Sequence, residues 1–453
     1  DGSYRQSKMF QRGVTCTNCH NPHTGKLVVQ GNGLCMQCHS PSGNAAFPNA
    51  AGEYDHPNHH HHRAESSGAQ CVNCHMPSRT YMGIQRRPDH SLRVPRPDLS
   101  PQTNSPNACN SCHTDKSTQW AADALGKWFG AKGTQKLHYG AVFNAYRNGH
   151  VQSIEPLLQL VTDAHQPNIV RATALAELAQ NKTEGIAQRM EATLSADPEI
   201  RAAAAESLEG VQINQRIQAL VPLLSDPIKA VRLAAAKSLS EVPSGSLDNP
   251  SNAILTRVLS EYLDAQGESA DMPSAQLNMG AILLNQGKLT DAEDHFQEAL
   301  RMDPQFAPAR LNLAQLYARG GQLKGAEDLL KKGISENPGD GDFQYALGLL
   351  LAQDGRLSEA VRVLARAAKL QPTRARIHYN LGLASQHMKR FKAAEDSLRI
   401  AQRLDARDPA IAYALAVLYL QMGEKDKARQ AALSLSSLSP TDPNLRALRN
   451  KLE

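Results

Sequence analysis

The chain has 453 residues with a formal net charge of +5, and 41% of its residues are hydrophobic. This length favours about three domains, and no apolar run approaches the roughly 20 residues that a membrane-spanning helix needs. The positive charge is concentrated in residues 1–150, which hold 15 Lys and Arg against 8 Asp and Glu, but no nucleic-acid-binding motif or aromatic platform accompanies it, so we expect no nucleic-acid partner.

Four C-x-x-C-H pentapeptides lie near the start of the chain and use all eight of its cysteines. This spacing is the attachment signature of c-type haem, in which two thiols bind the porphyrin covalently and the adjacent histidine ligates the iron. We therefore predict four covalent haem c groups. The attachment cysteines would be Cys16, Cys19, Cys35, Cys38, Cys71, Cys74, Cys109 and Cys112, and the proximal iron ligands would be His20, His39, His75 and His113.

Three other uses of these cysteines explain the pattern less well. Structural zinc sites need four nitrogen or sulfur ligands each, and all-thiolate sites would leave the recurring histidine without a role. A framework of four disulfides is typical of small secreted domains, whereas this chain has all its cysteines before residue 113. A thioredoxin-like C-x-x-C occurs singly beside a βαβ pattern, which this sequence lacks.

We expect residues 1–150 to form a haem domain with short helices around the attachment sites, little sheet and no stable fold without haem. Ile84 is the only isoleucine here, and Gly, Pro, Asn and Ser interrupt the stretch throughout. Such a sequence cannot bury enough side-chain surface for a conventional core, so porphyrins would supply the apolar interior. Near its end, Trp120 and Trp128 fit one face of a helix that Thr114 or Asp115 is expected to start.

The sixth ligand of each iron is expected to be a second histidine. His23 lies too close to a proximal ligand to reach the opposite face of the same iron, so it would serve a neighbouring haem. The run HPNHHHH, residues 56–62, could supply two or three ligands, and His90 lies among arginines suited to haem propionates. The rival ligands are Met9, Met36, Met76 and Met82, which would raise the potential. We predict bis-histidine irons with low potentials.

The stretches GVTCTNCHNPH, GAQCVNCHMPSRTYMGI, RRPDHSLRVPRPDLS and SPNACNSCHTDKSTQWAADAL resemble a family of secreted or periplasmic multihaem cytochromes with C-terminal tetratricopeptide repeats. The resemblance covers the predicted haem domain and continues into the repeats. It implies that the additional haem-ligand histidines are His23, His59, His60, His62 and His90. His56 and His61 fit the family pattern less well.

Two kinds of helical repeat are predicted after the haem domain. In residues 151–246, Arg171, Arg201 and Arg232 recur at the start of alanine-rich helices, which resembles short HEAT-like repeats. Residues 253–453 have the 34-residue period of tetratricopeptide repeats, with five repeats and a terminal helix; the marker alanines are Ala292, Ala326, Ala360, Ala394 and Ala428. The predicted fold is mainly α, with a haem-packed, loop-rich tetrahaem domain followed by an α-solenoid.

We expect an electron-transfer protein rather than an enzyme, because bis-histidine irons leave no open position for a substrate. Similarity to filament-forming multihaem cytochromes favours self-association into an extracellular conductive filament, with the repeats as an outer scaffold or a surface for redox partner proteins. The alternatives are a discrete periplasmic relay, a multihaem reductase with one open haem, and a scaffold whose repeats recruit a partner. Covalent haem attachment places the protein outside the cytoplasm in each case.

Overall fold

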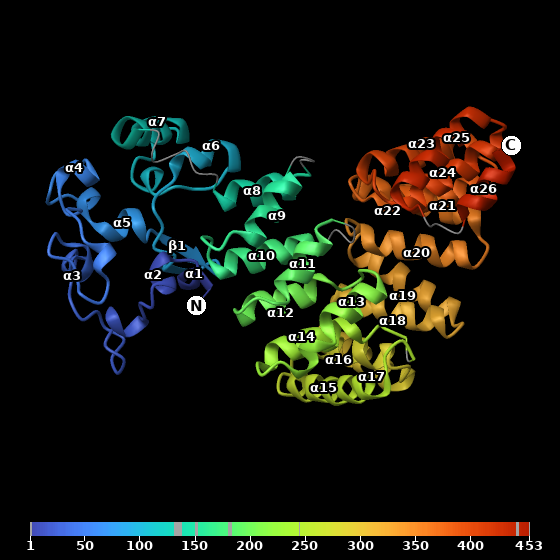
Figure 1. The fold of residues 1–453 in the computed structure, drawn as a ribbon, viewed down its shortest axis with the longest axis horizontal. Coiled ribbons are helices and arrows are strands. Elements are labelled where there is room, and N and C mark those ends of the chain that lie inside the picture. Colours follow the sequence, from blue (N-terminus) through green and yellow to red (C-terminus); the bar gives the residue numbers. More distant parts are fainter. Residues whose placement is uncertain are drawn as a thin grey trace. The chain divides into compact units, whose positions relative to one another are not determined.

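The computed structural model describes residues 2–130, 138–149, 153–179, 184–243, 245–440 and 444–452. The chain is mainly helical, which confirms the predicted fold class (Figure 1). Its contacts divide it into two units, residues 1–208 and 209–453, and this division falls inside the predicted HEAT-like segment. The predicted boundary between residues 150 and 151 lies outside the described residues. The predicted domain limits therefore stay predictions.

The first 130 residues form short helices joined by long loops. Motifs two and three lie on α3 and α5, and motifs one and four begin 3₁₀ turns at Cys16–Asn18 and Cys109–Ser111. Strands β1 and β2 pair as an antiparallel hairpin. The bounds are α1 Gly2–Arg5, α2 Lys8–Gln11, α3 Gly33–His39, α4 Pro57–His60, α5 Cys71–His75, β1 Ser78–Tyr81, β2 Gln85–Pro88, α6 Ser100–Thr103 and α7 Thr118–Phe129.

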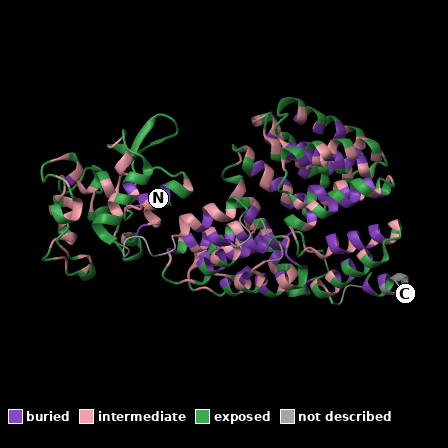
Figure 2. Ribbon diagram, turned by 90° about the horizontal axis from the view of Figure 1, so that it is seen from above, coloured by how far each residue is buried: buried purple, intermediate pink, exposed green. Residues whose placement is uncertain are grey.

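This region has almost no side-chain core. Between residues 2 and 130, the buried hydrophobic side chains in the described chain are Ala69, Leu99 and Ala121. Figure 2 shows the contrast, because buried residues gather along the helices of the repeats while the N-terminal part is mostly exposed or intermediate. A chain segment of this size needs a larger apolar interior to offset its conformational entropy. The geometry therefore agrees with an interior that porphyrins complete.

The tryptophan-bearing helix α7 begins later than the sequence predicted. It starts at Thr118, and Ser117 caps it by accepting a hydrogen bond from the Trp120 N–H (3.1 Å). The expected start at Thr114 or Asp115 is wrong, because the Lys116 N–H bonds the His113 carbonyl (3.2 Å) in a separate turn. A serine in extended conformation is a strong N-cap, and it takes that role here.

The HEAT-like helices are tied together by the recurring arginines. Each arginine donates from the start of its helix to carbonyls of the preceding segment, as Arg171 does to Val161 O (2.9 Å) and Arg201 does to Ser195 O (2.8 Å). Arg232 makes the bond equivalent to that of Arg201, to Asp226 O (3.3 Å). The helices are α8 Tyr139–Arg147, α9 Ile154–Thr162, α10 Asn168–Leu178, α11 Ile186–Ala192, α12 Pro198–Ser207, α13 Ile213–Leu220 and α14 Lys229–Leu239.

Arg189 on α11 is fully buried and holds the ends of two neighbouring helices. Its guanidinium donates to the carbonyls of Leu178 (2.5 Å), Glu184 (2.7 Å) and Ser207 (3.1 Å). Burial lowers its pKa to about 10, which leaves it charged at neutral pH. Arg189 thus satisfies carbonyls that the ends of α10 and α12 would otherwise leave without donors.

Replacing Arg189 with alanine should destabilise the first unit by about 3–5 kcal/mol, because two buried carbonyls and one half-buried carbonyl lose this donor. Hydrogen exchange of α10–α12 in the haem-loaded protein measures this. Glu191→Ala, on the same helix but exposed, should change exchange by no more than a few tenths of a kcal/mol. Equal exchange rates in the Arg189 variant and the wild type would contradict the role given to Arg189.

The C-terminal repeats form five helix pairs with the predicted period. The marker alanines at the helix crossings are all 0% exposed. The turn inside each pair is left-handed, at Gly287, Gly321, Gly355 and Gly423 and also at Lys389 (φ 57°). The helices are α15 Asn249–Gly267, α16 Pro273–Asn285, α17 Leu289–Met302, α18 Ala307–Arg319, α19 Leu323–Glu336, α20 Gly341–Gln353, α21 Leu357–Leu370, α22 Ala375–His387, α23 Phe391–Leu404, α24 Pro409–Met422, α25 Lys425–Leu438 and α26 Asn444–Leu452.

Candidate haem-binding centre

The eight cysteines form no disulfides, and neighbouring motifs bring them together in chain order. Burial raises the pKa of the Cys19 thiol, and the nearby Cys38 of motif two raises it further. Cys35 of motif two is hydrogen-bonded to Cys71 of motif three. Burial also raises the pKa of Cys74, with Cys109 of motif four as the next cause. The four attachment sites therefore follow one another in space as they do in sequence.

Asn32 fixes the second motif against the third. Its amide donates to Asp55 Oδ1 (2.9 Å) and to the Ala69 carbonyl (3.0 Å). Its own Oδ1 accepts the N–H of Cys71 (3.0 Å), the first residue of α5. No sequence pattern predicted this role, because a lone asparagine in a glycine-rich loop gives no signal beyond a turn.

Three proximal histidines each face a second imidazole from elsewhere in the chain. The ring centroids of His20 and His90 are 6.3 Å apart with an interplanar angle of 32°. His75 faces His59 at 6.2 Å and 5°. His113 faces His62 at 6.1 Å and 36°. The structure thus places His59, His62 and His90 each opposite the histidine of a C-x-x-C-H motif, and their role as iron ligands stays a prediction.

These separations fit one iron between two imidazoles. Metal–imidazole bonds are about 2 Å long, and the ring centre lies roughly 1 Å beyond the nitrogen, so two axial rings on one metal have centroids about 6 Å apart. Direct aromatic stacking would place parallel rings closer or offset. The same separation recurs at three sites that each contain a C-x-x-C-H histidine. The residues present therefore fit haem iron ligation at these three sites.

Backbone carbonyls orient most of these rings. A histidine that donates from Nδ1 keeps the Nε2 lone pair for a metal. The Nδ1 atoms that lie within hydrogen-bond distance of a carbonyl are those of His20 with Gly25 O (2.8 Å), His39 with Ala50 O (3.0 Å), His75 with Arg93 O (2.8 Å), His90 with Pro88 O (3.0 Å) and His62 with His60 O (2.5 Å). Burial also lowers the pKa of His59, which favours the neutral ring that a ligand needs.

The fourth proximal histidine has a different neighbour. The His39 ring meets the edge of Tyr54 (5.7 Å, 82°), and no imidazole of the described residues faces it as in the other three sites. Tyr54 also contacts His59 (5.2 Å), so it lies between sites two and three. The sequence alone gave Tyr54 no role.

Two predicted ligands have no proximal ring opposite them in the described chain. His23 is exposed on a loop that Asn21 closes, because the Asn21 side chain accepts the N–H groups of His23 (3.0 Å) and Thr24 (3.2 Å). The Nδ1 of His60 accepts the His62 N–H (3.2 Å), which places the proton of its ring on Nε2. The assignment of His60 as a ligand stays a prediction without a partner ring.

A residue with left-handed backbone conformation lies between His59 and His62, the two histidines of the run that face C-x-x-C-H histidines. His61 has φ 55° and ends α4, so His59 and His62 point to different sites. The His61 ring stacks on Trp128 (4.4 Å, 13°), and Trp120 lies 4.9 Å from His113. Helix α7 therefore lies beside the fourth motif and the histidine run.

Comparisons with known protein families match three parts of the chain. Residues 8–44 match a doubled C-x-x-C-H motif, residues 183–264 match HEAT repeats, and residues 230–452 match the C-terminal domain of cilia and flagella-associated protein 70. A search of curated proteins finds no match.

Several solved structures are similar to about two fifths of the chain. YrrB, described as a TPR protein with an unusual peptide-binding site, is 19% identical over 41% of this chain and 96% of its own, with a TM-score of 0.34. TTC0263, a thermophilic TPR protein of Thermus thermophilus, is 28% identical over 40% of this chain and 98% of its own, with a TM-score of 0.33. The pilF protein of Pseudomonas aeruginosa is 26% identical over 42% of this chain and 84% of its own, with a TM-score of 0.37.

The motif match and the site together define a protein that binds c-type haem covalently and carries HEAT and TPR-like repeats. Such attachment implies a location outside the cytoplasm. In the described part of the chain, no helix has the length and apolar character needed to cross a membrane.

Proposed function

We propose that this protein is an electron-transfer cytochrome with four haems, and that it is the subunit of an extracellular conductive filament. The three imidazole pairs carry the proposal, because an iron held on both faces can exchange electrons but has no position for a substrate. The contacts between cysteines of successive motifs support a continuous path from the first haem to the fourth.

The lack of a second imidazole opposite His39 in the described chain supports the proposed filament. His39 has no facing imidazole among the described residues, while His23 is exposed and held on a closed loop. We assign His23 of a neighbouring copy as the second ligand of the His39 iron. Donation from one subunit to the next is a head-to-tail contact, and such contacts generate fibres unless the rotation closes a ring.

A reductase is the second candidate, and one observation favours it. If no neighbour supplies an imidazole, the His39 iron keeps one position open beside the Tyr54 ring. Nitrite or cyanide would then bind to one iron in four. The discrete relay differs from both, because it requires a sixth ligand from the same chain at the His39 site.

His23→Ala tests the proposal on the haem-loaded full-length protein. We expect wild-type filaments in electron micrographs and discrete particles for the variant, with one of the four irons high-spin in its ferric spectrum. Added imidazole should restore the low-spin spectrum without restoring filaments, since it replaces the ligand but not the link between subunits. His165→Ala, an exposed histidine in the first unit, should behave as wild type.

Other outcomes would overturn parts of the proposal. Filaments of the His23 variant with four low-spin irons would remove His23 from the ligand set. A wild-type protein that stays discrete and binds nitrite at one iron would favour the reductase. A discrete wild-type protein with four low-spin irons would favour the relay.

A further inference from the structure

A cationic groove lies on the second unit between α19 and α21, with α20 beneath it. Its volume is about 350 Å³. Lys331, Arg362 and Arg366 line it with positive charge, and Ile334, Leu347 and Val363 supply apolar surface. The groove also contains the side chain of Gln344, which is only 3% exposed. The proposed electron path makes no use of this site.

The other repeats serve as internal controls for the charge of the groove. Positions 34 residues apart are equivalent in this array, and the position of Arg362 is occupied by Asp294, Asp328 and Asp396 in neighbouring repeats. The fold therefore accepts an acidic residue at this point of the helix. The helix pairing therefore does not require arginine at this position. Arg362 reverses the charge found in the neighbouring repeats and adds a cation to the groove.

The side chain of Gln344, which also lines the groove, differs in its hydrogen bonding from the residues at equivalent positions of the other repeats. At the equivalent positions, Gln276 donates to the Ala270 carbonyl (2.7 Å), Arg310 donates to the Pro304 carbonyl, and His378 lies 3.0 Å from the Pro372 carbonyl. Within the described chain, the Gln344 side chain makes no such bond and lines the groove instead. Because the Gln344 side chain lines the groove and makes no bond of this kind, its amide is available to a ligand.

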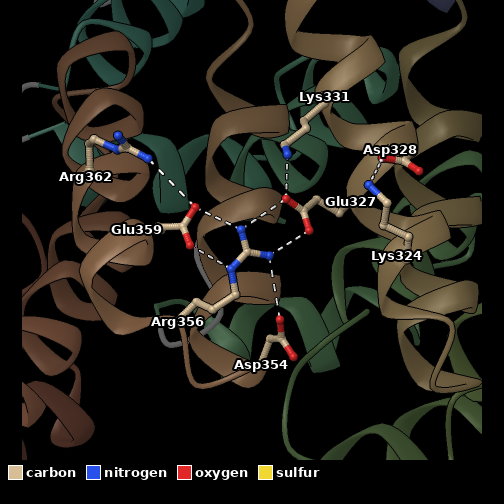
Figure 3. A network of polar contacts seen from close by, with 8 residues as sticks. All are labelled: Lys324, Glu327, Asp328, Lys331, Asp354, Arg356, Glu359 and Arg362. Carbon is tan, nitrogen blue, oxygen red and sulfur yellow. Dashed lines mark hydrogen bonds and ion pairs between the residues drawn. The ribbon is translucent and has the colours of Figure 1, made fainter.

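The acidic groups beside the groove are already engaged, as Figure 3 shows. Arg356 binds Glu327 (2.7 Å) and Glu359 (2.7 Å). This arginine, followed by Lys331, lowers the pKa of Glu327 to about 2, so the carboxylate is paired at neutral pH. Arg362 reaches Glu359 only at 3.8 Å, and Arg366 forms no ion pair with a residue of the described chain. Lys331 also pairs with Glu327 (2.6 Å), so the positive charge that the groove offers comes from Arg362 and Arg366.

We propose that this groove binds an acidic segment of a partner protein in which apolar residues alternate with carboxylates. Arg362 and Arg366 would pair with the carboxylates, because a guanidinium binds them bidentately. Leu347 and its apolar neighbours would accept the intervening side chain, and the Gln344 amide would bond the peptide backbone. Charge complementarity selects an acidic occupant over a neutral or basic one.

Fluorescence anisotropy with a fluorescein-labelled Glu-Leu-Glu-Leu-Glu-Leu peptide and the haem-loaded full-length protein tests this site. We expect saturable binding that weakens as salt rises, and no binding of the matched Gln-Leu peptide. Arg362→Asp, which restores the residue of the neighbouring repeats, should weaken binding about tenfold or more. Gln344→Leu should weaken it by a smaller factor. Lys369→Asp makes the same charge change on α21 outside the groove and should leave affinity within about twofold.

Three results would overturn the proposal. They are absence of saturable binding to the wild type, equal loss in the Arg362 and Lys369 variants, and equal binding of the two peptides. If Arg362→Asp instead abolishes association between copies of the chain, the occupant is a second copy and the partner is wrongly assigned. The haem spectrum should be the same in all variants. A loss of peptide binding can therefore be told apart from a failure of the electron-transfer proposal.

Discussion

Replacing His90 with alanine will convert one of the four irons from low-spin to high-spin. The His90 ring is the imidazole that faces His20, with centroids 6.3 Å apart, and its Nδ1 lies 3.0 Å from the Pro88 carbonyl, which leaves Nε2 for the iron. Removing this ring opens one axial position. Ferric electron paramagnetic resonance measures the fraction of high-spin iron, and cyanide should bind to the same fraction.

Two further variants sharpen this prediction. His90→Met should keep the iron six-coordinate and raise its potential, because thioether ligation favours the reduced state. His61→Ala should leave all irons low-spin, because the exposed His61 ring stacks on Trp128 and faces no proximal histidine. A His90→Ala protein with four low-spin irons would show that His20 has another partner.

Without haem, residues 2–130 will be unfolded while the repeats keep their helices. This stretch buries only Ala69, Leu99 and Ala121 among its described hydrophobic side chains, so haem must supply the interior that holds its loops. By contrast, each tetratricopeptide repeat buries its own alanines and leucines against the next repeat, and such stacking is stable without a cofactor.

Limited proteolysis of protein made without haem attachment measures this effect. We expect cleavage throughout the first 130 residues, with a protected fragment that begins among the HEAT-like helices. Circular dichroism should retain most of its helical signal, since the short helices of the haem region contribute little of it. Protection of residues 2–130 in the haem-free protein would contradict a porphyrin-based interior.

Covalent haem binding could be predicted from the sequence because it depends on the spacing of residues that are close together in the chain. A C-x-x-C-H pentapeptide needs no tertiary information, and the 34-residue period fixes which alanines meet between helices. Which second histidine faces which iron depends instead on the path of long loops. His90 reaches His20 across 70 positions of the chain, and no periodicity encodes that contact.

Smaller departures from the predictions have similar causes. The start of α7 at Thr118 depended on a turn that Lys116 makes with His113, and several polar residues nearby were equally good caps by sequence. The separation of His59 from His62 required the left-handed backbone of His61, which a non-glycine residue adopts only in context. The groove at Gln344 is lined by side chains from three helices, α19, α20 and α21, which no single stretch of sequence brings together.

Cryo-electron microscopy of the haem-loaded protein tests the central claim most directly. We predict filaments with four porphyrins per subunit, in which the His39 iron is bound on its other face by His23 of the next subunit. Density that shows a residue of the same chain opposite His39, or discrete particles at every concentration, would contradict this claim.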